Sequence, residues 1–468
     1  MLGSTRRIHF VGIGGIGMSG IAELLANLGY GVTGSDARRS EGTARLESRF
    51  GVTVFEGHAA ANIGDADVVV VSSAVKPANP EIVEARRRGI PVIPRAEMLA
   101  ELMRLRFAIA VAGSHGKTTT TSMIALVLER AGLDPTAVIG GRLSAFGSNA
   151  RLGRGEYMVA EADESDRSFL MLWPSIAVMT NIDHEHMESY GGFADLQQAF
   201  ADFANKVPFY GGVVACADDP SLAAILPRLK RRVITYGLQS RDATYAGSGV
   251  ELGSFGGRCV VEKRPHPQSG LERLGMLELV VPGRHNLQNA LAAVAVGELI
   301  GLDFARIAEA LRGFHGAERR FERHGEADGV LVIDDYGHHP TEIAAVLAAA
   351  RATVGRRLVV AFQPHRYTRT QQLMEQFGPS LRDADEIVLA DIYAASEEPI
   401  PGVTVDALAE SIARATGKRP HVARSLDAAL ATLLEIARTG DAVITLGAGS
   451  IGTLPKRLVA ALHERGTH

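Results

Sequence analysis

The hydrophobic positions of the chain recur as a short apolar run, a glycine-bearing turn and then a longer helical pattern. Short apolar runs that alternate with helical patterns are typical of parallel sheets with helices on their faces. The series starts three times, with apolar runs at 7–11, 107–111 and 330–334, and three further runs follow at 358–362, 386–389 and 442–446. The pattern therefore predicts an α/β protein built from three such units, with helices expected at 119–131 and from Pro340 onward.

No low-complexity linker separates the three units. We therefore place each boundary where one unit ends and the next strand begins, and we predict domains of residues 1–104, 105–314 and 315–468. A chain of 468 residues is long enough for about three domains. The segment 240–275 is polar, rich in glycine and poorly periodic, so we expect an irregular excursion within the middle domain.

Composition argues against several classes of partner and compartment. A net charge of −4 does not suggest a nucleic-acid or membrane-surface partner. The two cysteines, Cys216 and Cys259, are too few for a disulfide framework and fit a reducing compartment. The longest apolar stretch, 290–302, is interrupted by Glu298 and is shorter than the roughly 18–20 residues that span a bilayer. The glycine-rich run after Arg7 has no small-residue cleavage site, so we interpret it as folded protein and expect a cytoplasmic location.

The first glycine loop follows a predicted strand and opens a helix. Its glycines are spaced as in the dinucleotide-binding fingerprint, in which backbone N–H groups approach a diphosphate. NAD, FAD and UDP-sugars all carry a diphosphate, so this motif alone would also fit a nicotinamide-dependent oxidoreductase. The residues expected to contact such a ligand are Gly12, Gly14, Gly15 and Gly17, Asp36 at the end of the next strand, and the strand-end hydroxyls of Ser72 and Ser73.

A second glycine loop, at 111–119, also lies between a predicted strand and a helix. Gly116, Lys117 and Thr118 form the diagnostic end of a P-loop, where backbone amides hold phosphates, the lysine meets the β- and γ-phosphate charge and the threonine binds Mg²⁺. Strict Walker A spacing would place a glycine at position 111, where the chain has Val111. The chain has only 7 lysines against 42 arginines, so the choice of lysine at this position indicates a specific role for it. The residues expected to hold ATP are Gly113, Ser114, His115, Gly116, Lys117, Thr118 and Thr119.

Acidic side chains follow the next predicted strand. Glu161 closes the strand 157–160 and opens the cluster 161–166, which is too acidic to be buried without cations. A carboxylate in this place serves Mg²⁺ in NTPases, because Mg²⁺ prefers hard oxygen ligands. A later strand ends before 181–186, and the absence of a nearby cysteine favours a second Mg²⁺ site there over zinc. The expected metal ligands are Thr118, Glu161 and His186, and no metal-binding role is expected for His184.

Five ordered motifs resemble those of the Mur ligase family over essentially the whole chain. They are the P-loop variant at 113–119, the helix start at 283–290, the segment Arg319-Arg320-Phe321, and the runs 334–342 and 363–370. The resemblance implies an N-terminal Rossmann-like UDP-binding domain, a central P-loop ATPase-like domain and a C-terminal Rossmann-like domain. It also implies ATP-dependent joining of an amino acid to the carboxylate of UDP-N-acetylmuramate through an acyl phosphate, with ATP and Mg²⁺ as cofactors.

The resemblance further implies roles for individual residues. Asn286 and Asn289 are expected at adenine, Arg320 and Asp335 at ATP, Tyr336 at nucleotide or substrate, His338 at phosphate or the incoming amine, and Arg366 and Arg369 at the carboxylate of the amino acid or substrate. Guanidinium groups suit this last role because their paired N–H groups match a carboxylate. The expected catalytic set is Lys117, Glu161, His186, His338, Arg366 and Arg369.

Within the family, the loop 12–20, the run 161–170 and the form of 334–342 are most similar to those of the member that adds L-alanine. A relative that reattaches a murein tripeptide shares the first two but has phenylalanine where this chain has Tyr336, and it is the main alternative. A nicotinamide-dependent oxidoreductase and a non-catalytic nucleotide sensor are more distant ones. We expect a monomer or weak homodimer that takes UDP-N-acetylmuramate and L-alanine as substrates.

Three positions are left open by the resemblance. Glu185 stands where the family usually has aspartate, and Ser396 stands where many relatives have arginine or glycine. Lys206 does not match the modified lysine that supports the metals in sister ligases. No role is assigned to these residues.

Overall fold

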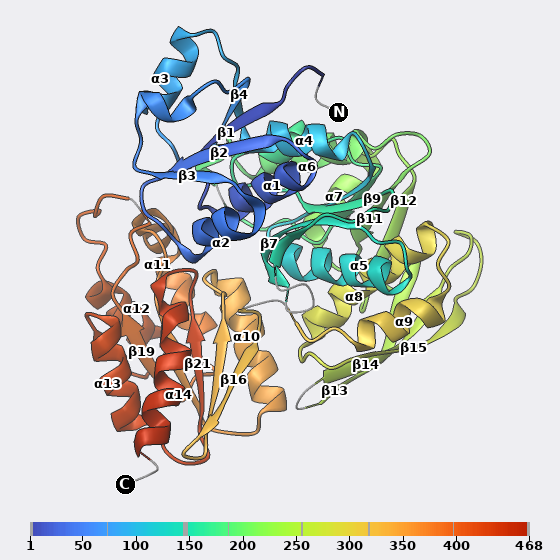
Figure 1. The fold of residues 1–468 in the computed structure, drawn as a ribbon. Helices are drawn as coiled ribbons and strands as arrows, with labels where there is room; N and C mark the ends of the chain where they lie inside the picture. Colours follow the sequence, from blue (N-terminus) through green and yellow to red (C-terminus); the bar gives the residue numbers. More distant parts are fainter. Residues whose placement is uncertain are drawn as a thin grey trace. The chain divides into compact units, whose positions relative to one another are not determined.

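The computed structural model describes residues 3–72, 74–143, 148–185, 187–253, 256–316, 319–395 and 397–465. Within these ranges the chain forms three sheets with helices packed against them (Figure 1). The α/β class predicted from the hydrophobic pattern is confirmed.

The N-terminal sheet is parallel, with the strand order β3-β2-β1-β4-β5. Its strands are β1 (Arg7–Val11), β2 (Gly31–Asp36), β3 (Thr53–Glu56), β4 (Val68–Val71) and β5 (Val92–Pro94), and its helices are α1 (Ile16–Asn27), α2 (Glu41–Phe50), α3 (Pro80–Arg87) and α4 (Arg95–Met103). The chain moves outward from β1 to β3 and then places β4 on the other side of β1. The strand order therefore reverses between β1 and β4, the place where open α/β sheets bind their ligands.

The middle sheet has the order β15-β14-β13-β12-β11-β10-β6-β9-β7-β8. Its strands are β6 (Phe107–Ala112), β7 (Thr136–Leu143), β8 (Ser148–Arg151), β9 (Tyr157–Glu161), β10 (Ile176–Met179), β11 (Gly212–Cys216), β12 (Val233–Gly237), β13 (Tyr245–Gly253), β14 (Gly256–Lys263) and β15 (Glu272–Leu279). Its helices are α5 (Lys117–Arg130), α6 (Phe193–Asn205), α7 (Pro220–Ile225), α8 (Arg284–Leu299) and α9 (Phe304–Arg312). The central strands β6 and β10 are parallel neighbours and almost wholly buried, which explains their continuous apolar sequences.

The prediction for 240–275 was wrong. Two strands, β13 and β14, and the first residues of β15 occupy this segment at one end of the middle sheet. Tyr245 and Ala246 begin β13 as buried residues, but most of its later residues are exposed or half-buried. A strand with little buried surface carries few apolar residues, so its hydrophobic periodicity is weak in the sequence.

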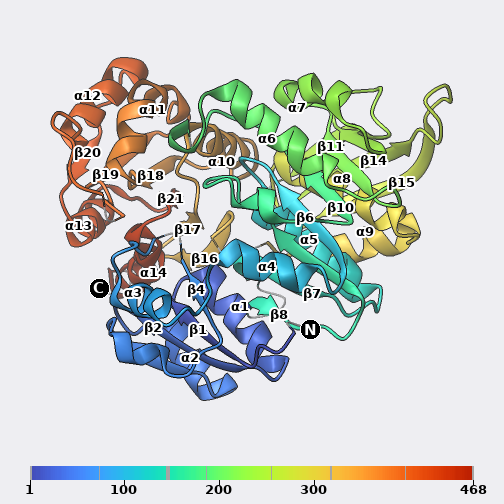
Figure 2. The ribbon, with the colours of Figure 1, turned by 90° about the horizontal axis from the view of Figure 1, so that it is seen from above.

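The C-terminal sheet has the order β16-β17-β21-β18-β19-β20, with β16 antiparallel to β17 and the other pairs parallel. Its strands are β16 (Glu322–Ala327), β17 (Val330–Asp335), β18 (Leu358–Phe362), β19 (Glu386–Ala390), β20 (His421–Ala423) and β21 (Ala442–Leu446). Its helices are α10 (Pro340–Thr353), α11 (Tyr367–Ser380), α12 (Val405–Thr416), α13 (Leu426–Ile436) and α14 (Leu454–Arg465). Alternate strand residues form two cores, one under α10, α11 and α12 and one under α13 and α14 (Figure 2).

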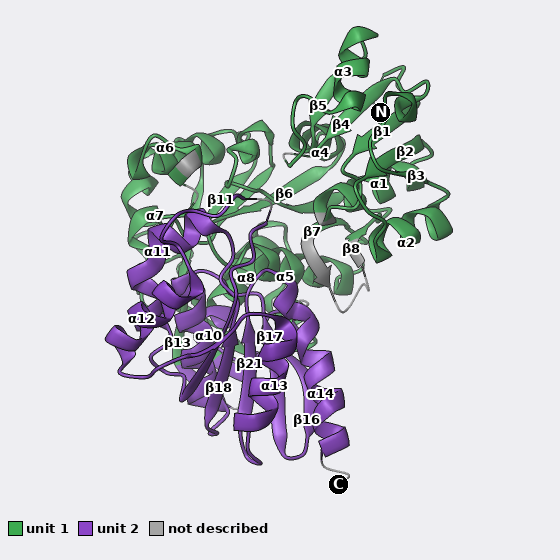
Figure 3. Cartoon of the chain, turned by 90° about the vertical axis from the view of Figure 1, so that its left-hand side faces the viewer, with its two compact units in different colours: residues 1–249, 259–277, 288–314 green, residues 250–258, 278–287, 315–468 purple. Residues whose placement is uncertain are grey.

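Internal contacts divide the chain into two compact units (Figure 3). The first unit contains residues 1–249, 259–277 and 288–314, and the second contains 250–258, 278–287 and 315–468. The domain boundaries near 104 and 315 stay predictions. Among the described residues, no helix combines the length and the apolar character needed to cross a membrane.

Candidate functional site

The first glycine loop crosses the carboxyl edge of the N-terminal sheet where the strand order reverses. The backbone N–H groups of Gly12 and Ile13 donate to the carbonyl oxygen of Ser35 at 2.8 and 3.0 Å. Gly12 has a φ of 83°, and a Cβ at this residue would lie 3.2 Å from Cβ of Ser72. Glycine therefore lets the ends of β1, β2 and β4 meet in a narrow turn whose backbone a ligand can approach.

Two of the predicted diphosphate contacts also hold the loop in place. Oδ2 of Asp36 accepts a hydrogen bond from the N–H of Gly14 at 2.8 Å, and a Cβ on Gly14 would lie 2.8 Å from that oxygen. The hydroxyl of Ser72 accepts from the N–H of Ala74 at 3.4 Å, as expected for a turn. Ser73 lies outside the described residues. Direct contact of Asp36 and Ser72 with a ligand stays a prediction.

A buried polar cluster supports the end of β2 from below the glycine loop. Glu81, on α3, accepts hydrogen bonds from the hydroxyl of Ser35 and the side-chain amide of Asn62, each at 2.6 Å. Nδ1 of His58 lies 3.3 Å and Nε2 of His9 lies 3.7 Å from the same carboxylate. Burial alone would raise the pKa of Glu81, but the interactions with His9, Ser35 and Asn62 lower it to about 2. Sequence analysis gave no signal for this cluster.

The depressed pKa of Glu81 predicts a pH-dependent contribution to stability. A carboxylate with a lowered native pKa stabilises the fold above its ordinary pKa of 4.5, and this contribution is lost as the pH falls toward about 2. The contribution is at most roughly 3.5 kcal/mol, because each pKa unit corresponds to about 1.4 kcal/mol. We expect Glu81→Gln to lower the thermal midpoint at pH 6 to 7 and to converge on wild type as the pH falls below 4.5. The control is Glu47→Gln, because Glu47 is a surface carboxylate that pairs with Arg39. A difference in thermal midpoint between Glu81→Gln and wild type that stays constant from pH 7 to pH 3.5 would refute the assignment.

The P-loop joins β6 to α5 and is held by residues at the end of β10. The hydroxyl of Thr180 and the side-chain amide of Asn181 both donate to the carbonyl oxygen of His115, at 2.6 and 3.0 Å. Oδ1 of Asn181 accepts from the N–H of His115 at 2.8 Å. A Cβ on Gly113 would lie 1.9 Å from the hydroxyl oxygen of Thr180, so only glycine fits there. The structure thus explains the need for glycine at 113, whereas Val111 is a buried residue of β6.

Lys117 is the first residue of α5 and its ammonium group lies over the P-loop. It donates to the carbonyl oxygens of Gly113 and Ser114 at 2.5 and 3.2 Å and to Oε1 of Glu164 at 2.9 Å. Burial opposes the charge of Lys117, but the carboxylates of Glu164 and Asp163 raise its pKa above the ordinary value. Burial raises the pKa of Glu164 to about 7, although Lys117 acts in the opposite direction. Sequence analysis placed Glu164 in an acidic cluster without giving it a role.

Carboxylates approach the P-loop from two strand ends. Glu161 ends β9 beside Val111 of β6. Beyond β10, Oδ2 of Asp183 lies 2.9 Å from Nε2 of His115, and Oε2 of Glu185 lies 3.9 Å from its Nδ1. These oxygens, with the hydroxyl of Thr118 in the first turn of α5, are the hard ligands that Mg²⁺ takes. A donor set dominated by carboxylate and hydroxyl oxygens is the kind that Mg²⁺ prefers.

The two histidines of 181–186 differ in what the structure describes. His186 lies outside the described residues, so its expected metal contact stays a prediction. The ring of His184 stacks on Phe193 with 3.9 Å between ring centroids and 7° between planes. His184 thus has a packing role.

Helix α8 brings one of the predicted adenine residues to the P-loop. A Cβ on Gly116, whose φ is 80°, would lie 2.9 Å from Oδ1 of Asn289. Asn289 and Gly116 are therefore in close contact. The side-chain amide of Asn286 donates to the carbonyl oxygen of Pro282 at 2.7 Å at the start of the same helix.

The second unit gathers several predicted residues at the carboxyl end of β17. The guanidinium groups of Arg319 and Arg320 lie 5.2 and 5.3 Å from the ring centroid of Tyr336. Asp335 is buried and accepts hydrogen bonds from the N–H groups of Phe321 and Gly337, both at 2.7 Å. Burial raises the pKa of Asp335 to about 6. These bonds show Asp335 bracing the loop, and its contact with ATP stays a prediction.

Histidines link the ends of β17 and β18 in this unit. His338 lies 5.7 Å from His365 between ring centroids, and burial lowers the pKa of His338 well below its usual range. Burial followed by the charges of Arg369 and Arg366 lowers the pKa of His365 to about 4. The charge of Arg369 therefore acts on both His338 and His365, and the roles predicted for His338, Arg366 and Arg369 stay predictions. Arg366 has a φ of 70°, an uncommon conformation for a residue other than glycine.

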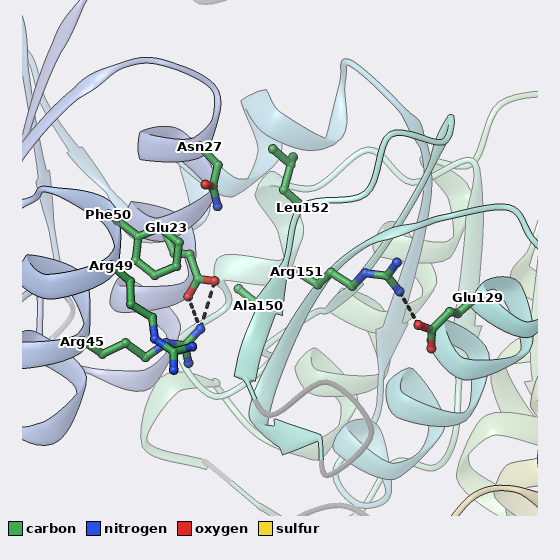
Figure 4. A pocket seen from close by; sticks show the side chains of 9 residues that line it. All are labelled: Glu23, Asn27, Arg45, Arg49, Phe50, Glu129, Ala150, Arg151 and Leu152. Atoms are coloured by element: carbon green, nitrogen blue, oxygen red, sulfur yellow. Dashed lines mark hydrogen bonds and ion pairs between the residues drawn. The ribbon is translucent and has the colours of Figure 1, made fainter.

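A pocket of about 620 Å³ in the first unit is lined by residues that belong to neither phosphate loop (Figure 4). Its walls are Glu23, Asn27, Arg45, Arg49, Phe50, Glu129, Ala150, Arg151 and Leu152. Arg45 donates to both carboxylate oxygens of Glu23, at 3.0 and 2.9 Å, and Arg151 pairs with Glu129 at 2.8 Å. Glu129 is near the C-terminal end of α5, about 18 Å along the helix from Lys117. This pocket is therefore distinct from the P-loop site around Lys117.

Comparison with known proteins gives matches along most of the chain. The models described as Mur ligase family, catalytic domain, as Mur ligase middle domain, and as Mur ligase, glutamate ligase domain match residues 7–107, 111–297 and 319–449. The chain is 54% identical over 465 residues to a UDP-N-acetylmuramate–L-alanine ligase from Acidobacterium capsulatum, covering 99% of both chains. It is 55% identical over 458 residues to the ligase of that name from Myxococcus xanthus, covering 97% of this chain and 95% of that one.

Solved structures show the same resemblance. The UDP-N-acetylmuramate-alanine ligase from Thermotoga maritima superimposes with a TM-score of 0.83 at 31% identity, covering 98% of this chain and 99% of that one. A murein peptide ligase from Psychrobacter arcticus gives a TM-score of 0.72 at 28% identity, with the same coverage.

Proposed function

The chain belongs to the Mur ligase family, and we propose that it uses ATP to join L-alanine to the lactyl carboxylate of UDP-N-acetylmuramate in peptidoglycan precursor synthesis. Relatives that carry this activity in their names are more than half identical over nearly the full length. The murein tripeptide ligase is not favoured, because the structure of such a ligase is less similar than that of the alanine ligase. The observation that carries the proposal is a P-loop with a half-buried lysine, next to Glu161, in the same compact unit as a glycine loop at a strand-order reversal.

The chemistry explains why a P-loop is needed for amide formation. A carboxylate is a poor electrophile, so one of its oxygens attacks the γ-phosphorus of ATP to give an acyl phosphate and ADP. The uncharged amine of L-alanine then attacks the acyl carbon, the amide forms and phosphate leaves with the former carboxylate oxygen. The protein must bring two anions together and align them, which is the main requirement of phosphoryl transfer.

The residues of the first unit supply this alignment. We propose that the N–H groups of 113–119 hold the ATP phosphates and that Lys117 leaves Glu164 to meet the γ-phosphate charge. Thr118, Glu161 and His186 are the proposed ligands of Mg²⁺, which would offset phosphate charge when bound. Asn289 lies on the P-loop turn at Gly116, which supports its proposed place near the nucleotide.

The residues of the second unit are proposed to serve the nucleotide and the amino acid. Asn286, Arg320 and Asp335 are assigned to ATP, and Tyr336, His338, Arg366 and Arg369 to L-alanine and the reacting carboxylate. Burial lowers the pKa of His338 and so keeps its ring uncharged at neutral pH, and a neutral ring nitrogen can accept a hydrogen bond from an amine. We further propose a cytoplasmic monomer or weak homodimer without a nucleic-acid or membrane partner.

Arg369→Ala is expected to raise KM for L-alanine by about 10- to 100-fold, because one charge-assisted pair with a carboxylate is lost. KM for ATP should change by less than about 3-fold, since this residue is assigned to the amino acid. Arg369→Lys should recover only part of the loss, because ammonium cannot form the paired bonds of a guanidinium. Arg382→Ala, an exposed arginine of the same unit, is the control. An unchanged KM for L-alanine in Arg369→Ala would remove Arg369 from the amino-acid site.

Phosphate release with purified protein, Mg²⁺, ATP and UDP-N-acetylmuramate tests the function. We expect release to depend on L-alanine in a panel of the twenty amino acids and to be far lower with the tripeptide L-Ala-γ-D-Glu-diaminopimelate. Release that follows the tripeptide instead would assign the recycling activity. Tight binding of NADH, without ATP consumption under any of these conditions, would favour the oxidoreductase interpretation.

A further inference from the structure

We propose that Arg95, which no motif identified, binds the diphosphate of the UDP-sugar at the first glycine loop. The inference rests on the proposed function and adds a substrate-binding residue to it. Arg95 directly follows β5, at the same carboxyl edge of the N-terminal sheet as the glycine loop after β1, Asp36 at the end of β2 and Ser72 after β4. In open α/β sheets this edge, beside the reversal of strand order, is where ligands bind.

The guanidinium group of Arg95 lies directly against the glycine loop. A Cβ on Gly17 would lie 3.1 Å from Nη1 and 3.3 Å from Cδ of Arg95. In the dinucleotide fingerprint the third glycine normally allows a helix to pack closely on a strand. Here the atoms that exclude a side chain at Gly17 belong to an arginine. Glycine at 17 therefore keeps a cation beside the backbone that is expected to hold the diphosphate.

Arg95 also lies at a position in its own helix where a positive charge is unfavourable. It is the first residue of α4, after Pro94, which provides no side-chain cap. A positive charge is unfavourable at a helix N-terminus because the helix dipole is positive there. A local arrangement that lowers helix stability is expected where a residue serves a ligand.

The partner of Arg95 leaves it able to bind an anion. Nη2 of Arg95 lies 3.6 Å from Oδ2 of Asp163, and among the described residues the guanidinium has this ion pair and no hydrogen bond. The side chain is 23% exposed. Its N–H groups are therefore available to phosphate oxygens, for which the guanidinium fork is well matched.

Asp163 connects Arg95 to the ATP loop. It lies in the acidic cluster after β9, and the charges of Lys117 and Arg95 lower its pKa although burial opposes them. Arg95 thus lies between the glycine loop and the acidic cluster that faces Lys117. Arg95 pairs with Asp163, and Asp163 belongs to the acidic cluster that faces Lys117. A UDP-sugar bound by Arg95 would therefore lie on the side of the sheet edge that faces the P-loop.

The test uses equilibrium binding of three uridine ligands to the full chain. UDP-N-acetylmuramate carries both a diphosphate and a carboxylate, UDP-N-acetylglucosamine carries only the diphosphate, and uridine has neither. We expect Arg95→Gln to weaken binding of both UDP-sugars by a similar factor of about 10- to 100-fold, while uridine binding changes by less than about 3-fold. Arg95→Lys should recover part of the loss. The control Arg104→Gln alters an exposed arginine at the other end of α4 that pairs with Glu101, and it should bind like wild type.

Three outcomes would overturn the assignment. Unchanged Kd values in Arg95→Gln would show that Arg95 does not bind substrate. A loss confined to UDP-N-acetylmuramate would place the carboxylate, not the diphosphate, at Arg95. An equal loss for uridine, or a lowered thermal midpoint shared with Arg95→Lys, would indicate a structural role. Because binding is measured without turnover, a wild-type protein that binds UDP-sugars but consumes no ATP would refute the proposed function and leave this assignment intact.

Discussion

Replacement of Lys117 by alanine is expected to lower ATP-dependent turnover by on the order of 10²- to 10³-fold or more and to leave UDP-sugar binding unchanged. The carbonyl oxygens of Gly113 and Ser114 already hold the ammonium group over the P-loop, so only its bond to Glu164 is exchanged when the γ-phosphate binds. A fixed cation stabilises the charge of the transferring phosphoryl group without reorganisation during the reaction. The glycine loop that is proposed to hold the UDP-sugar contains none of these contacts. Phosphate release measures turnover, and calorimetric titration with UDP-N-acetylmuramate measures binding.

The control for Lys117→Ala is Lys230→Ala, which alters an exposed lysine of the same compact unit. It should match wild type in both measurements. Loss of turnover and of UDP-sugar binding together in Lys117→Ala would contradict the separation of the two phosphate loops. Normal turnover in that variant would contradict the assignment of the P-loop itself.

Glu161→Gln is expected to lower kcat by on the order of 10²-fold, because a metal-held phosphoryl group depends on several kcal/mol of charge stabilisation. The substitution keeps the shape of the side chain and removes its charge at the end of β9, beside the start of the P-loop. The Mg²⁺ concentration for half-maximal rate should rise about 10-fold or more, since the metal loses an anionic ligand or its support. The measurement is kcat as a function of Mg²⁺ at saturating ATP and substrates.

Glu156→Gln is the control for Glu161, because Glu156 is exposed and immediately precedes the same strand. It should leave both kcat and the Mg²⁺ requirement unchanged. A lower kcat in Glu161→Gln at an unaltered Mg²⁺ requirement would assign Glu161 to the reacting groups and remove it from the metal site.

The architecture could be predicted where strands are buried on both faces. The apolar runs at 107–111 and 358–362 are central strands, and their sequences are almost wholly hydrophobic because no residue faces water. The helix expected at 119–131 begins at Lys117, since Gly116 adopts the left-handed conformation that precedes the first turn. The strands at 245–253 and 256–263 were missed because exposed strand residues carry no apolar signal.

The phosphate loops could be located from sequence, but not the residues that support them. Glycine spacing identifies a loop because the backbone itself binds the ligand. The groups that fix the P-loop, Thr180 and Asn181, come from another strand, and only the parallel pairing of β6 with β10 brings them close. Glu164 likewise meets Lys117 across 47 residues of sequence. Such partners depend on tertiary structure and leave no local pattern.

Two aspartates that were expected to contact ligands also hydrogen-bond the protein's own loops. Asp36 was predicted from its strand-end position to contact a ligand, and the family resemblance implied the same for Asp335. In the structure both carboxylates accept backbone N–H groups of the adjoining loops, from Gly14 and from Phe321 and Gly337. A strand-end acid can serve the loop, the ligand or both, and the sequence does not separate these roles.

The origin of the oxygen in the released phosphate tests the account most directly. UDP-N-acetylmuramate labelled with ¹⁸O in both lactyl carboxylate oxygens would be incubated with ATP, Mg²⁺, L-alanine and the enzyme. An acyl phosphate requires one labelled oxygen in each phosphate released and one retained in the amide of the product. Phosphate free of label, or hydrolysis of ATP with no gain of alanine by the UDP-sugar, would contradict activation of the carboxylate by this protein.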